Sequence, residues 1–138
     1  MGELMPNDSP TAQEILDSAD DAQRKLAAQE KTLQKEIQNI DDIEFDHPLT
    51  DEEKRLRENL RTAQTQCRAG MVELAFVTLE ALDDSAEVQN LASAFKTINA
   101  DLKTALDRVK HLASIAATAQ QVVDAVAKVA TQLAKFVV

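Results

Sequence analysis

The side chains best able to do chemistry are few and lie far apart in the sequence. The chain of 138 residues holds one cysteine and two histidines. His47 and His111 lie in different halves of the chain, and neither accompanies a serine or cysteine in a nucleophile turn. Cys67 falls between Ala63 and Gly70 on an apolar helical seam, where a thiol usually acts as a small core side chain. We therefore expect exposed histidines, a buried thiol and a protein that is not an enzyme.

Carboxylates gather in the segment 42–53, which reads DIEFDHPLTDEE. Its oxygen-bearing residues at positions 1, 3, 5, 9 and 12 resemble an EF-hand calcium loop. Such a loop needs glycine at position 6, where the chain turns with positive φ, but His47 stands there directly before Pro48. Thr50 and Glu53 have the spacing of a helix capping box. We interpret the segment as an acidic linker that leads into a helix, and we expect neither a metal site nor a cofactor.

The composition indicates an all-α protein, because two glycines and three prolines cannot supply the many reversals of a sheet protein. Apolar residues recur at spacings of three and four in three runs. These runs predict helices over about 10–41, 50–82 and 86–137. Residues 1–9 are expected to form a disordered tail, and 10–138 a single helical domain.

The expected helix boundaries differ in clarity. Ser9 followed by Pro10 is a suitable start for the first helix. Asp84 can cap the third helix after a turn at 83–85, although the apolar register also allows one continuous helix through this junction. Residues 71–79 are apolar on nearly every side of the second helix, so they are expected to lie deep between neighbours.

The third run is the most regular, with no glycine or proline over 86–137. We expect an antiparallel three-helix bundle, resembling a coiled coil, in which this long helix extends past its two partners. Its exposed end would carry an apolar interface made of Ile115, Ala119, Val122, Val123, Val126, Val129, Leu133, Phe136 and Val137. The alternative is that the helix bends near 113–118 and folds back as a fourth helix, which would cover this seam.

Charge is distributed unevenly along the chain. Residues 1–84 hold 20 acidic and 9 basic side chains, a net charge of −11, whereas 85–138 hold 4 acidic and 6 basic, a net charge of +2. Nucleic-acid binding is not expected, because it needs a concentrated basic field. The uncharged stretch 112–123 is too short to span a bilayer, and the first residues do not resemble a secretory signal. With a single cysteine there is no intramolecular disulfide, so we expect a cytoplasmic protein.

Two functions fit these features. The leading hypothesis is a non-enzymatic helical interaction protein that self-associates, or binds a partner helix, through the C-terminal seam. The alternative is a membrane-active protein that uses the same amphipathic segment to form a pore or to bind at a lipid interface. We favour the first, because the polar face of that segment offers only Lys128 and Lys135 as cations, with Asp124 between the apolar positions.

Overall fold

The computed structural model describes residues 9–137, and within this range the chain forms helices and contains no β-strand. The all-α prediction is therefore confirmed. The expected tail, apart from Ser9, lies outside the described residues. The helices are α1 (Ala12–Asp46), α2 (Asp51–Leu74), α3 (Leu79–Leu82), α4 (Ser85–Asp107) and α5 (Ala113–Lys135).

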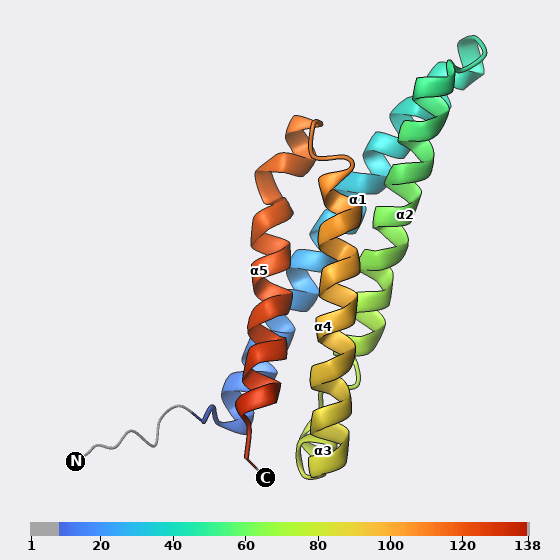
Figure 1. Ribbon diagram of the computed structural model, residues 1–138. Helices are drawn as coiled ribbons and strands as arrows, with labels where there is room; N and C mark the ends of the chain where they lie inside the picture. The colour runs from blue at the N-terminus through green and yellow to red at the C-terminus, as the bar shows by residue number, and fades with distance from the viewer. Residues whose placement is uncertain (1–8, 138) are drawn as a thin grey trace.

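The four long helices run in alternating directions and form two hairpins (Figure 1). α1 packs against α2 and α5, while α4 packs against α2 and α5, so each long helix has two long neighbours. The short α3 lies at the end of the molecule where α4 begins (Figure 1). The α1–α2 hairpin reaches past the connection between α4 and α5 (Figure 1), so the part that extends beyond its neighbours is this hairpin.

The single long helix expected over 86–137 is wrong. The chain leaves the helix after Asp107, turns at 108–112 and returns as α5. The turn contains no glycine or proline, and Leu112, the N-cap residue of α5, makes no side-chain hydrogen bond to the helix. Because local signals are absent, apolar burial is the force that reverses the chain: Val109 in the turn and Ile115 just after it are fully buried. The alternative of a fold-back as a fourth helix agrees with the structure, but the bend expected near 113–118 lies at 108–112, and 113–118 are the first residues of α5.

The beginnings of the helices follow their capping residues. The capping box of Thr50 and Glu53 is confirmed, and Asp84 caps α4 through hydrogen bonds from the amides of Ala86 and Glu87. The expected cap at Ser9 is wrong, because the capping box at the start of α1 is formed by Thr11 and Glu14. The turn expected at 83–85 is present, since α3 ends at Leu82 and α4 starts at Ser85.

The second predicted helix, over 50–82, is interrupted. α2 ends at Leu74, and Thr78 caps the new helix α3 by accepting a hydrogen bond from the amide of Ala81. The expectation that 71–79 lies deep between neighbours is only partly correct. Leu74 and Val77 are buried, whereas an apolar set on the outer side of this connection is exposed: Val72 (61%), Phe76 (56%) and Leu79 (62%).

Two buried amides fix how α1 lies against its neighbours. Gln29 is 1% exposed and accepts a hydrogen bond from the hydroxyl of Thr118 on α5. Gln64 on α2 is 6% exposed and donates to Glu30 at 2.7 Å and to Gln34 at 2.6 Å. Sliding either helix by one turn would leave a buried polar group opposite apolar side chains, which is unfavourable. These contacts therefore favour a single register.

A substitution of Leu133 can test whether the inner face of α5 is buried against helices of the same chain. Its side chain is 1% exposed, so Leu133→Ala should lower the free energy of unfolding by about 2–5 kcal/mol. The loss, measured by urea denaturation, should not depend on protein concentration, because the surrounding groups belong to the same chain. Val72→Ala is the matched control: Val72 is 61% exposed on α2, and its truncation should have little effect. A loss that appears only at high protein concentration would contradict intramolecular burial.

Candidate functional site

The seam predicted as an interface is largely the inner face of α5. Six of its nine residues are buried in the core: Ile115, Val122, Val123, Val126, Val129 and Leu133. Ala119 and Phe136 are partly buried and pack against the core, and Val137 alone is largely exposed. The expectation of an uncovered overhang is thus corrected, because α1 and α4 cover the seam. Heptad spacing is the same whether the neighbouring helix belongs to the same chain or to another.

Membrane entry, the alternative function, would use this same apolar face of α5. In the structure the face lies toward α1 and α4, so α5 would have to leave the core to contact lipid. Within residues 9–137, no helix combines the length and the apolar character needed to cross a bilayer.

A groove of about 950 Å³ lies between α4 and α5 and runs to the C-terminal end of α5. Its α4 wall includes Val88, Ala92 and Asn99, and its α5 wall includes Ala127, Ala130, Thr131, Ala134 and Phe136. The charged side chains lining it are Lys96 and Lys135. A second hollow of about 250 Å³ lies farther along the same two helices, beside Ala119 and Val123. The outer side of the α4–α5 hairpin is therefore hollowed at two places.

The outer face of α5 carries a second regular pattern. Its residues alternate at spacings of four and three and are exposed, apart from the partly buried Ala127: Ala113, Ala117, Gln120, Asp124, Ala127, Thr131 and Ala134. We call this set the outer stripe. Most of its members are small, so another helix could approach α5 closely along it. The outer stripe was missed in the sequence, although its spacing is visible there, because the larger side chains of the inner seam dominate the apolar pattern.

The remaining chemistry-bearing residues are placed mostly as expected. Cys67 is fully buried, and burial raises the pKa of its thiol from an ordinary 9.0 to about 12. Gly70 lets α1 come close, since a methyl group there would lie 2.9 Å from Leu26 Cδ1. His47 and His111 are both exposed. Across residues 9–137, no three His, Cys, Asp or Glu side chains are grouped so that they could hold a metal ion.

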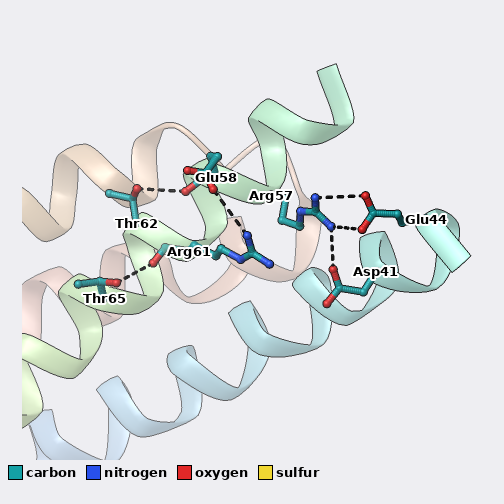
Figure 2. A network of polar contacts seen from close by, with 7 residues as sticks. All are labelled: Asp41, Glu44, Arg57, Glu58, Arg61, Thr62 and Thr65. Atoms are coloured by element: carbon teal, nitrogen blue, oxygen red, sulfur yellow. Dashed lines mark hydrogen bonds and ion pairs between the residues drawn. The ribbon is translucent and has the colours of Figure 1, made fainter. Parts of the chain in front are cut away.

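The acidic segment 42–53 includes the end of α1 and is held by an arginine. Arg57, 16% exposed, lies between Asp41 and Glu44, with nitrogen-to-oxygen distances of 3.0 Å and 2.7 Å (Figure 2). Its hydrogen bond to Glu44 lowers the pKa of that carboxyl group from its ordinary 4.5, and the guanidinium pKa is raised. These ion pairs allow α1 to continue to Asp46, beyond its expected end at 41. The hairpin tip also presents Phe45, which is 92% exposed.

Comparison of the chain with protein-family models, with curated protein sequences and with solved structures found no match.

The buried thiol gives a prediction on reactivity and on pH. Native Cys67 should resist a thiol-specific reagent at pH 8 and react after unfolding. Because the folded pKa is raised from 9.0 to about 12, the thiol's contribution to stability is fully present below pH 9 and is lost as the pH rises toward 12. Cys67→Ala should lack this loss in urea denaturation measured across that range. Rapid labelling of the folded protein would contradict the buried placement.

The arginine at the hairpin tip gives a prediction on acid stability. Since the pKa of Glu44 is lowered, its pairing with Arg57 stabilises the fold above about pH 4.5 and is lost as the pH falls below that value. Arg57→Gln should make unfolding less dependent on pH in this range and should speed amide exchange at 43–50. Arg61→Gln is the control, because Arg61 pairs with Glu58 on the same helix and is 51% exposed. Equal effects of the two variants would contradict a specific role for Arg57.

Proposed function

We propose that this chain is a non-enzymatic helical interaction protein that self-associates through the outer side of the α4–α5 hairpin. The observation that carries the proposal is the groove of about 950 Å³ between these two helices, bordered by the outer stripe. The occupant that we propose is α5 of a second copy. This proposal keeps the interaction role expected from the sequence. The interaction surface that we now propose is the outer face of the hairpin, not the inner seam of α5.

Charge favours this face over the rest of the surface. α1 carries ten acidic and four basic side chains, whereas α5 carries one acidic and two basic. Two copies that meet through α5 therefore bring together little like charge, while contact between their α1 helices would repel. If two α5 helices cross antiparallel around residue 126, Asp124 of each lies near Lys128 of the other. This reciprocal pairing is the self-complementary arrangement of a two-fold dimer.

The size of the face also fits a dimer. α5 has 23 residues, and a helix of that length spans about 35 Å at 1.5 Å per residue. Stable specific interfaces bury about 1,200 Å² or more in total. Contact along both α4 and α5 can reach this area, whereas contact with the short α3 could not. The lone buried thiol of Cys67 agrees with the further proposal of a cytoplasmic location, where disulfides are rare.

Thr131, exposed in the groove wall, provides the test. The mass measured by light scattering after size exclusion should be twice that of the monomer, and Thr131→Glu should reduce it to the monomer, because the carboxylate would be buried at the contact. Thr65→Glu is the matched control on the exposed side of α2 and should leave the dimer intact. Melting curves of both variants would show that each is folded. A wild-type monomer at all concentrations, or a dimer that survives Thr131→Glu, would refute the proposal.

A further inference from the structure

Three exposed apolar side chains lie around the connection between α2 and α3, and none of them lines the groove between α4 and α5. Val72, Phe76 and Leu79 are 56–62% exposed within eight residues of chain. They stand among the largest exposed apolar side chains of residues 9–137, together with Phe45 and Val137. Single exposed apolar residues are common on proteins, but three large ones on one short connection call for an explanation.

The sequence around this connection carries charge of one sign. Between Arg68 and Lys96 the chain has no basic residue and five carboxylates: Glu73, Glu80, Asp83, Asp84 and Glu87. Within the described residues none of the five forms an ion pair. α3 also packs against α1, whose first turns add Glu14 and Asp17 and no cation before Arg24. We call the three apolar residues and the five carboxylates the acidic corner.

The unpaired carboxylates distinguish this connection from the other acidic run of the chain. Between Lys35 and Lys54 there is also no lysine or arginine, but Asp41 and Glu44 of that run pair with Arg57. Elsewhere on α1, Asp20 pairs with Arg24 and Asp21 with Lys25. Capping explains only Asp84, whose side chain accepts from two amides at the start of α4. The other four carboxylates form no ion pair within residues 9–137, and all four lie within eight residues of Leu79 in the sequence, Glu80 and Glu87 in the first turns of α3 and α4. An apolar centre with a rim of one charge sign is typical of a surface that selects its partner by charge.

From this charge complementarity we propose that the acidic corner binds a basic amphipathic helix of another protein. Apolar side chains on one face of that helix would cover Phe76 and its neighbours, and flanking lysines or arginines would approach the carboxylates. A second copy of this chain does not fit, because two acidic corners repel and the chain has no strongly basic segment, 85–138 carrying only +2. An anionic membrane is disfavoured by the same repulsion. The proposal is independent of self-association, since it uses different residues.

The test uses the full chain and a fluorescent amphipathic peptide made of leucine and lysine, with binding followed by anisotropy. Phe76→Ser should weaken binding by at least about tenfold, the effect expected when one large apolar contact is lost. Phe45→Ser is the matched control, because Phe45 is 92% exposed at the opposite end of α2, and it should leave the affinity unchanged. The corresponding leucine and glutamate peptide should not bind.

A second variant separates charge from apolar contact. Glu80→Gln combined with Asp83→Asn should weaken binding at low ionic strength, and the difference from wild type should shrink at about 0.15 M salt, where the Debye length is about 8 Å. All substituted positions are exposed, so helix content and melting temperature should stay unchanged. Equal losses from Phe45→Ser and Phe76→Ser, or equal binding of the acidic peptide, would overturn the proposal. Because these variants leave α5 untouched, the oligomeric state reports separately on the dimer.

Discussion

Burial of the inner face of α5 against α1 and α4 is the interaction on which the rest of this structure depends. It reverses the chain at 108–112, a place with no glycine, proline or capping side chain. The hairpin that results gives α4 a second long neighbour and turns the small residues of α5 outward. Without this burial, α4 and α5 would continue as one long helix, and the groove between them would not exist.

The same burial divides the molecule into two unlike halves. The α1–α2 hairpin holds most of the charge and is tied together by ion pairs, among them Arg57 with Asp41 and Glu44. The α4–α5 hairpin has few charges, and its outer side is hollowed. A heavily charged, solvated half and a weakly charged half with small side chains are suited to different surroundings. Only the second can meet another protein without removing many charges from water.

How much of this could be predicted from the sequence depends on the range of the interaction responsible. The helical class, the buried Cys67, the capping box at Thr50 and the cap at Asp84 all follow from local pattern, and all are confirmed. The end of the predicted helix 86–137 could not be found in this way, because its heptads continue through the turn and the reversal depends on contacts of α5 with α1 and α4.

For the connection after α2, the sequence pattern predicted burial where the structure shows exposed side chains. The apolar residues over 71–79 predicted a buried helix segment, but α2 ends at Leu74. In the short α3, the side chain of Leu82 is buried, whereas that of Leu79 is exposed. A run that is apolar on every side does not indicate which side neighbouring helices will cover. The missing cations between Arg68 and Lys96 were a signal available in the sequence, since an ordinary solvated surface usually carries both signs.

The two proposed surfaces should respond to salt in opposite ways. Each copy carries a net charge of −9, so two copies repel at long range even where their α5 helices match. Salt screens this repulsion and strengthens apolar pairing of the α4–α5 faces, whereas it weakens attraction between the acidic corner and a basic partner. The proposed self-association and the proposed partner binding therefore depend on separate forces, one mainly apolar and one largely electrostatic. Under these two proposals, the dimer persists while a charged partner exchanges, because the contact that salt weakens is not the contact proposed to join the two copies.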